Sequence, residues 1–311
     1  MSSAILHGPG RAAQPSARRA LAGLALVAAL GTAGPALAAA ACAGIAPGAD
    51  RPVRNLAYLP PTAGLPAAVH RLDLWPGARP LPAPLVVFVH GGTWMHGGKY
   101  AGTPRQARAF REAGYAYATV NYRLLRHGPP QEAARDIAEA VAFLRREARG
   151  CGLDPDRIIL MGHSAGAHLA ALVALDESYL EGAGVPAEAV RAVVLLDAYG
   201  LDIALHVRET ADPVYPRVFG PDPEGWRAMS PISHAAPGRR PPPPVILHVD
   251  GDNPETPGQA RALAQALRAA GGEAEVFDAE GEGHNSLNYG FGAPGDETTR
   301  RTLDFLARQV R

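Results

Sequence analysis

The sequence predicts an α/β fold: a doubly wound, mostly parallel sheet in a single domain, with a short lid or wall insertion. Two observations predict it. Short apolar runs that suit strands buried on both faces alternate along the chain with segments whose apolar residues recur at helical spacing. The chain of 311 residues is 47% hydrophobic and shows no internal repeat, so it can form one sizeable core.

The first forty residues differ in composition from the rest. Arg18 and Arg19 precede an apolar run over 20–33, and small residues follow at 36–38. This order is typical of a secretory signal, and the run is too short for a comfortable membrane span. We therefore expect export to the periplasm or the outside of the cell. The expected parts are a signal peptide over 1–38 with cleavage near 38–40, a linker over 39–52 and a catalytic domain over 53–311.

Two details of this leader leave alternatives open. The Arg18-Arg19 pair resembles a twin-arginine signal, and Cys42 after 39–41 resembles a lipoprotein cleavage box without its usual leucine, which would anchor the chain through a lipid. A cleaved, alanine-rich leader is favoured over both. The two cysteines, Cys42 and Cys151, can form at most one disulfide, and neither has the spacing of a zinc site.

Strands are predicted where apolar residues alternate or run together between glycine, proline and polar residues. Val69–Leu74 alternates, whereas Leu85–Val89 is continuously apolar and ends in His90-Gly91-Gly92, as expected of a strand in the centre of a sheet. The other predicted strands are 115–120, 157–161, 190–196, 245–249 and 274–277.

Helices are predicted between these strands. Residues 132–149 carry Ile137, Val141 and Leu144 on one face, and 166–175 is rich in alanine, which favours tight packing. The other two predicted helices are 259–270, closed by a pair of glycines, and 298–310. The proline-rich segment 198–244 shows no clear period, and we assign it to a lid or substrate-binding wall.

The strongest chemical signal is Gly162-His163-Ser164-Ala165-Gly166, which lies directly between a predicted strand and a predicted helix. A serine in so sharp a turn has strained backbone angles, and side chains two residues away would collide. Glycines at 162 and 166 remove those side chains. The pattern predicts that Ser164 is a nucleophile at the start of a helix.

A serine nucleophile needs a base and a carboxylate that orients the base. His284 follows the last predicted strand in a glycine-rich loop and is the predicted base, whereas His168 is assigned to helix packing. Asp252 is the predicted carboxylate because it follows the strand 245–249. Asp250 is the alternative, and Asp197 is interpreted as a structural carboxylate.

Donors for a developing oxyanion are expected where glycines let the backbone approach the substrate. We predict that they are the backbone N–H groups of Gly92, Thr93 and Ala165. Trp94, His163, Tyr199 and Trp226 are the predicted walls of the substrate-binding site.

These residues resemble the α/β-hydrolase fold, and more narrowly the branch of hormone-sensitive-lipase-like carboxylesterases, feruloyl and acetyl-xylan esterases, and kynurenine formamidases. The order of further segments resembles this branch too, namely Val120-Asn121-Tyr122-Arg123-Leu124, Asp136, Asp154-Pro155-Asp156-Arg157 and Ser230-Pro231-Ile232. By this resemblance Ser164, Asp252 and His284 form a catalytic triad. Thr93-Trp94 stands where lipase-like members carry a third glycine, which is closer to the formamidase and feruloyl-esterase pattern.

The resemblance implies a secreted serine carboxylesterase that hydrolyses short-acyl or aryl esters, small or linked to polysaccharide, through an acyl-enzyme. It implies no cofactor and no metal. The alternatives are an arylformamidase of the kynurenine type and, more remotely, a non-catalytic binding protein. The 30 basic and 30 acidic side chains give no net charge, which argues against nucleic acid as a partner.

Overall fold

A computed structural model describes residues 42, 51–77, 80–237, 240–251, 253 and 255–310. They belong to one compact unit, Pro35–Arg311. The predicted signal peptide lies outside the described residues. Among the described residues, no helix combines the length and apolar character needed to cross a membrane.

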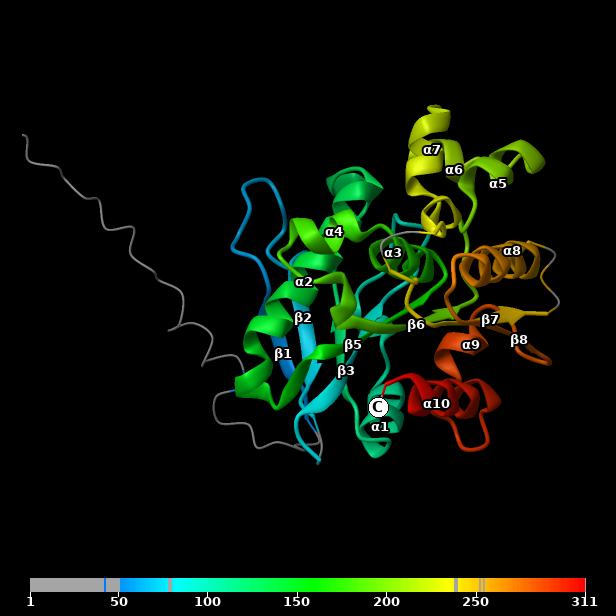
Figure 1. The fold of residues 1–311 in the computed structure, drawn as a ribbon. Helices are drawn as coiled ribbons and strands as arrows, with labels where there is room; N and C mark the ends of the chain where they lie inside the picture. The colour runs from blue at the N-terminus through cyan, green and yellow to red at the C-terminus, as the bar shows by residue number, and fades with distance from the viewer. Residues whose placement is uncertain are drawn as a thin grey trace, which may run out of the picture. The chain divides into compact units, whose positions relative to one another are not determined.

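Eight strands form one sheet in the order β1-β2-β4-β3-β5-β6-β7-β8 (Figure 1). The pairs β1–β2 and β2–β4 are antiparallel, and all other neighbours are parallel. The predicted fold class is therefore confirmed. The strands are β1 (Val53–Ala57), β2 (Arg71–Trp75), β3 (Ala83–Val89), β4 (Ala116–Val120), β5 (Leu153–His163), β6 (Val190–Leu196), β7 (Val245–Asp250) and β8 (Ala274–Ala279).

Helices cover both faces of this sheet (Figure 1). Buried residues of α2 (Pro130–Cys151), α3 (Ala165–Leu175) and α8 (Thr256–Ala269) share one apolar cluster with one face of the strands. Buried residues of α1 (Pro104–Glu112) and α10 (Glu297–Gln309) pack on the other face. Because β3, β6 and the second half of β5 (158–162) are buried on both faces, these stretches consist of nearly unbroken apolar residues.

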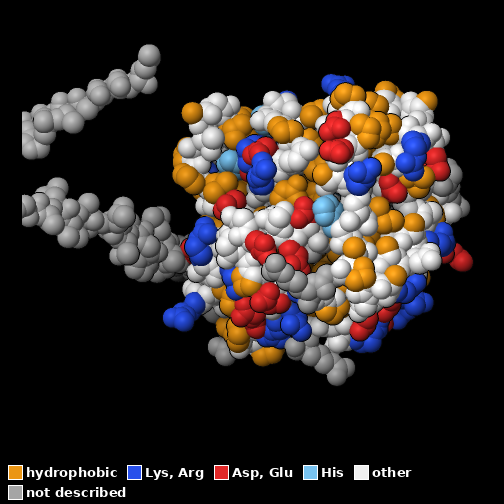
Figure 2. Space-filling model, turned by 45° about the horizontal axis from the view of Figure 1, so that its top comes forward, with side chains coloured by type: hydrophobic (Ala, Val, Ile, Leu, Met, Phe, Trp, Pro, Cys, Tyr) orange, Lys and Arg blue, Asp and Glu red, His pale blue; other side chains and the backbone are white. Residues whose placement is uncertain are grey.

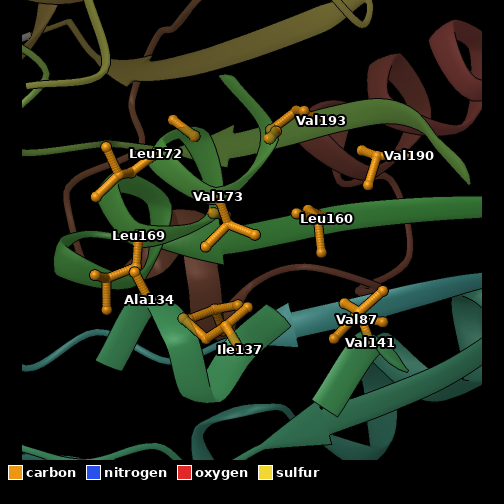
Figure 3. Close-up of a cluster of buried hydrophobic side chains, with 14 of the residues drawn as sticks. Val87, Ala134, Ile137, Val141, Leu160, Leu169, Leu172, Val173, Val190 and Val193 are labelled. Carbon is orange, nitrogen blue, oxygen red and sulfur yellow. The ribbon is translucent and has the colours of Figure 1, made fainter. Parts of the chain in front are cut away.

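Figure 3 shows how the first of these clusters holds the central strand. Ile137 and Val141 of α2 and Val173 of α3 face Leu160 of β5, and Val87 and Val193 extend the cluster over the neighbouring strands. Helix α2 begins with Pro130 in its first turn and ends at Gly152, which has the left-handed conformation that stops helices.

The segment 198–244, predicted as a long wall or lid, contains three short helices instead of irregular chain. They are α5 (Ile203–Glu209), α6 (Val214–Phe219) and α7 (Pro223–Met229). Each has six or seven residues, too few for a helical period to stand out in the sequence. The other short helices are α4 (Glu177–Gly182), α9 (Ser286–Tyr289), and the 3₁₀ turns η1 (Lys99–Ala101), η2 (Leu125–His127), η3 (Ala187–Ala189) and η4 (Pro231–His234).

Cys42 and Cys151 form a disulfide, which attaches the chain before β1 to the end of α2. The sequence left this pairing open. A cysteine sulfur in a disulfide cannot also carry a lipid thioether, so pairing and lipid anchoring at Cys42 exclude each other. Figure 2 shows one face of the molecule, on which basic side chains are scattered among acidic ones rather than gathered into a patch.

Candidate active site

Ser164 lies in the sharp turn between β5 and α3, as the sequence predicts. Its backbone angles are φ 57° and ψ −128°, a conformation that costs a residue with a side chain about 1–3 kcal/mol. The turn is held because the Ser164 N–H donates to the Leu196 carbonyl of β6, 2.9 Å away. The serine is therefore fixed at the end of the sheet where the parallel strands finish.

The two glycines around Ser164 are required by close backbone contacts. A Cβ atom at Gly162 would lie 2.3 Å from the Gly166 carbonyl oxygen, and one at Gly166 would lie 2.2 Å from the Val89 carbonyl oxygen. Real Cβ atoms do not come so close to backbone. The two glycines are thus required for a different reason from the predicted collision with the serine: Gly162 lets β5 approach the first turn of α3, and Gly166 lets α3 approach the end of β3.

His284 follows β8, and its Nδ1 lies 2.6 Å from Asp197 Oδ2. The Asp197 side chain is fully buried, and its Oδ1 accepts hydrogen bonds from the Asp250 main-chain N–H and the Thr256 hydroxyl. Hydrogen bonds to both oxygens offset the cost of burying this carboxylate. A carboxylate held in this way favours the imidazole tautomer with its proton on Nδ1, which leaves Nε2 able to accept a proton.

This pairing differs from the one assigned from the sequence. The carboxylate bonded to the imidazole is Asp197, which the sequence analysis interpreted as merely structural. Asp250, the alternative, accepts from the main-chain N–H of His284 at 3.1 Å instead of from its ring. Asp252 lies outside the described residues. Since β6 and β7 are adjacent parallel strands, a carboxylate after either strand reaches the same edge, and chain order alone could not choose between them.

The predicted wall residues His163 and Tyr199 both contact His284. The His163 ring lies 4.5 Å from the His284 ring, and His163 Nε2 donates to the His284 carbonyl at 2.7 Å. Burial, with a smaller contribution from His284, lowers the pKa of His163 to about 4, so this ring stays neutral at pH 7. Tyr199 presents its ring edge-on to His284 and accepts a hydrogen bond from Asn253.

The predicted wall residues Trp94 and Trp226 make hydrogen bonds within the protein. Trp94 is 3% exposed, donates from Nε1 to His168 Nδ1 at 3.1 Å, and meets the Phe219 ring of α6 at 4.9 Å. Trp226 is partly buried and donates from Nε1 to the Gly220 carbonyl at the end of α6. Trp94 therefore attaches α6 to α3, and Trp226 attaches α7 to α6. His168, assigned to helix packing, completes this arrangement by donating to the Met229 carbonyl.

The chain from His90 to Lys99, here called the HGG loop, lies against Ser164. A Cβ atom at Gly91 would be 2.9 Å from the Ser164 Cβ, so only glycine fits there. The loop then coils tightly, with positive φ at Gly92, Thr93 and Trp94, and the Gly92 carbonyl accepts from the N–H groups at 95 and 96.

The predicted oxyanion donors have unused N–H groups. Within the described chain, the backbone N–H groups of Gly92, Thr93 and Ala165 donate to no protein acceptor. Two of them belong to the HGG loop and the third to the first residue of α3. The described residues contain no group of three or more His, Cys, Asp or Glu side chains that could hold a metal ion.

Comparisons with known proteins agree with this arrangement of motifs. The BD-FAE family matches residues 72–267. Esterase LipQ of Mycobacterium tuberculosis is 33% identical over 210 residues, which cover 65% of this chain and 49% of that protein. A probable isoprenylcysteine alpha-carbonyl methylesterase of Oryza sativa is 28% identical over 233 residues, covering 70% and 56%. The chain thus spans about half the length of these curated relatives.

Solved structures share the fold. A truncated form of a carbohydrate esterase from gut microbiota superimposes with a TM-score of 0.68 at 20% identity, over 83% of this chain and 95% of that one. The butyrate-bound esterase Est2 of Thermogutta terrifontis has a TM-score of 0.61 at 25% identity, over 76% and 89%.

The contacts at Gly166 predict that two glycine substitutions differ strongly in their effect on the free energy of unfolding. Gly166→Ala forces a Cβ atom into the backbone of β3, and we expect a loss of at least about 3 kcal/mol in the free energy of unfolding, or no folded protein. Gly182→Ala is the control, because nothing lies within 4 Å of its Cβ position and it ends the short helix α4. Urea denaturation measures both variants. Equal stabilities would contradict the packing argument.

Four buried histidines predict how stability depends on pH. Burial lowers the pKa of His90, His163 and His168 to about 4 and that of His248 to about 3, whereas an unfolded chain has values near 6.5. The unfolded state therefore binds protons first as the pH falls. The contribution of the four buried, neutral histidines to the free energy of unfolding is therefore complete above about pH 6.5 and is lost towards pH 4.

We expect the free energy of unfolding to fall between pH 7 and pH 5 by about 2 kcal/mol for each histidine that stays neutral. Urea denaturation at pH 7, 6 and 5 measures this fall in a range where carboxylates contribute little. His248→Gln removes one titrating group and should make the dependence shallower. A stability that does not change over this range would show that these rings titrate normally.

Proposed function

Because the chain belongs to the BD-FAE family and has the α/β-hydrolase fold, we propose that it hydrolyses carboxylic esters with Ser164 as nucleophile. The observation that carries the proposal is the hydrogen bond between His284 Nδ1 and the buried Asp197 carboxylate, beside a serine held in a strained turn. A binding protein would have no need of this combination.

In the proposed reaction, His284 Nε2 takes the proton of Ser164 Oγ as the oxygen attacks the ester carbonyl. Asp197 keeps the imidazole in the required tautomer and stabilises its positive charge. The N–H groups of Gly92, Thr93 and Ala165 receive the negative charge on the carbonyl oxygen. His284 then protonates the departing alcohol, and water releases the acid from the acyl-enzyme by the same route.

Among the residues that the structure describes, no hydrogen bond joins the Ser164 hydroxyl to the His284 imidazole. Catalytic pairs are often loosely aligned until substrate is bound. The link between them runs through His163, which follows Gly162 in β5 and donates to the His284 carbonyl. This contact fixes the histidine loop to the residue next to the nucleophile.

We propose short-acyl or aryl esters as substrates. The exposed large hydrophobic side chains among the described residues are Leu81, Tyr100 and Tyr289, and none of them belongs to α5, α6 or α7. A lid for long acyl chains would present a broad apolar surface. Here the aromatic side chains of α6 are occupied by contacts with Trp94.

We also propose that the protein acts outside the cytoplasm. The leader pattern over 1–38 supports export, and the Cys42–Cys151 disulfide is a bond that forms and persists in oxidising compartments. The formamidase alternative rested on Thr93-Trp94 in the HGG loop. Since Trp94 is buried against α6, its described contacts favour no particular substrate.

Ser164→Ala tests the nucleophile. We expect kcat for p-nitrophenyl acetate to fall by about 10⁴-fold or more, because only the oxyanion donors and the binding site then remain. Ser178→Ala, on the exposed α4, is the matched control and should keep full activity. Assays with longer p-nitrophenyl esters, methyl ferulate, acetylated xylan and N-formylkynurenine would identify the preferred substrate. Retention of most activity in Ser164→Ala would exclude this mechanism.

Three aspartate variants test which carboxylate orients His284. Asp197→Asn should lower kcat by about 10⁴-fold, because an amide favours the wrong imidazole tautomer. Asp250→Asn should cost far less, since its oxygen bonds the main chain of His284. Asp252→Asn completes the set. Thermal denaturation verifies that each variant is folded, and a large loss confined to Asp252→Asn would restore the assignment made from the sequence.

A further inference from the structure

The segment Asn121–Arg126 follows β4 and takes no part in the proposed chemistry, yet it contacts the HGG loop along its length. We propose that this segment, here called the bracing segment, positions the HGG loop so that the N–H groups of Gly92 and Thr93 can act as oxyanion donors. The inference rests on the proposed function. Tyr122 is its central positioning residue, and Asp136 is its anchor.

Tyr122 holds the start of the HGG loop. Its hydroxyl donates to the His90 carbonyl at 2.7 Å, and its ring stacks on the His90 ring at 4.2 Å. Both residues are buried. Burial raises the pKa of the Tyr122 phenol, so the group is a donor at neutral pH. The bond fixes the carbonyl directly before the two glycines.

The rest of the bracing segment holds the middle and the end of the loop. The Leu125 N–H donates to the Trp94 carbonyl at 2.9 Å, and the Lys99 N–H donates to Asn121 Oδ1 at 2.6 Å. The loop is thus tied at its beginning, middle and end to one short stretch of chain. Between these ties lie Gly92 and Thr93, whose N–H groups have no acceptor in the described protein.

The bracing segment is fixed in turn by Asp136 of α2. This fully buried carboxylate accepts from the Arg123 main-chain N–H at 2.8 Å and from the Arg123 guanidinium through Nε at 2.9 Å and Nη2 at 2.6 Å. His70 Nε2 lies 3.2 Å from Asp136 Oδ1. The position of the loop therefore depends on a helix in the hydrophobic core, one residue before Ile137.

Such support matters because oxyanion donors stabilise a transition state only when they are fixed in place beforehand. Three successive positive φ angles in the HGG loop need surrounding structure to hold them. A shift of about half an ångström would leave substrate binding intact but weaken the hydrogen bonds to the tetrahedral intermediate. A variant that loses a hydrogen bond of the bracing segment should therefore have a lower kcat with little change in KM.

Tyr122→Phe tests the inference, because it keeps the stacked ring and removes only the hydroxyl. We expect kcat for a p-nitrophenyl ester to fall about 10- to 100-fold, with KM within about twofold of the wild-type value. The affinity for a trifluoromethyl ketone, which binds as a tetrahedral adduct, should fall by the same factor. Titration with a fluorescent phosphonate counts the reactive serines, so all rates refer to active protein.

Tyr117→Phe is the matched control. Tyr117 is also fully buried, and its hydroxyl donates to Gln106 Oε1 at 2.8 Å in α1, outside the HGG loop. It should lower the melting temperature without changing kcat per titrated site. Asn121→Ala, which releases the other end of the loop, should reproduce the loss of kcat and of ketone affinity, and it serves as the test if Tyr122→Phe does not fold.

The outcomes separate the two proposals. Wild-type protein that takes up no phosphonate and cleaves no ester would overturn the esterase proposal and this inference with it. Active wild-type protein, with Tyr122→Phe and Asn121→Ala unchanged in kcat per titrated site, would overturn the inference alone. A loss in Tyr117→Phe equal to that in Tyr122→Phe would also overturn it, because the effect would then follow general stability.

Discussion

The hydrogen bonds of the buried Asp197 carboxylate are the interaction on which the arrangement around His284 depends. Its two oxygens bind donors from three separate segments: the Asp250 N–H at the end of β7, the Thr256 hydroxyl at the start of α8, and His284 after β8. A charge removed from water must be satisfied by such donors, so these segments can adopt only arrangements in which all of them reach Asp197. One side chain thus links the ends of two strands to the orientation of the His284 ring.

Much of this arrangement could be predicted from local sequence. The parallel sheet is predicted by apolar runs such as Leu85–Val89. The turn at Ser164 is predicted by the glycines on either side of it, where a Cβ atom would collide with backbone atoms. Which carboxylate bonds the His284 ring could not be predicted, because Asp197 and Asp250 lie at the ends of neighbouring strands. Only the path of the loop that carries His284 decides between them. The short helices of 198–244 escaped prediction because six or seven residues carry no measurable period.

Aromatic residues illustrate a second limit of sequence. Trp94 and Trp226 are predicted from the sequence to be walls of the substrate-binding site. Both indole N–H groups instead bond protein acceptors, His168 Nδ1 and the Gly220 carbonyl. The neutral tautomer of His168 completes this arrangement, since its Nε2 donates to Met229 while its Nδ1 accepts from Trp94. The same residue types serve packing or binding, and only their partners distinguish the two roles.

The disulfide has a consequence for handling the protein. Cys151 lies two residues before the first residue of β5 and Ser164 directly after the last, so the length of this strand, roughly 35 Å, separates the cross-link from the turn at Ser164. Cys42 is therefore held near the end of β5 that lies away from Ser164. A bead, electrode or fusion partner coupled close to that cross-link would leave the Ser164 turn facing away from the support.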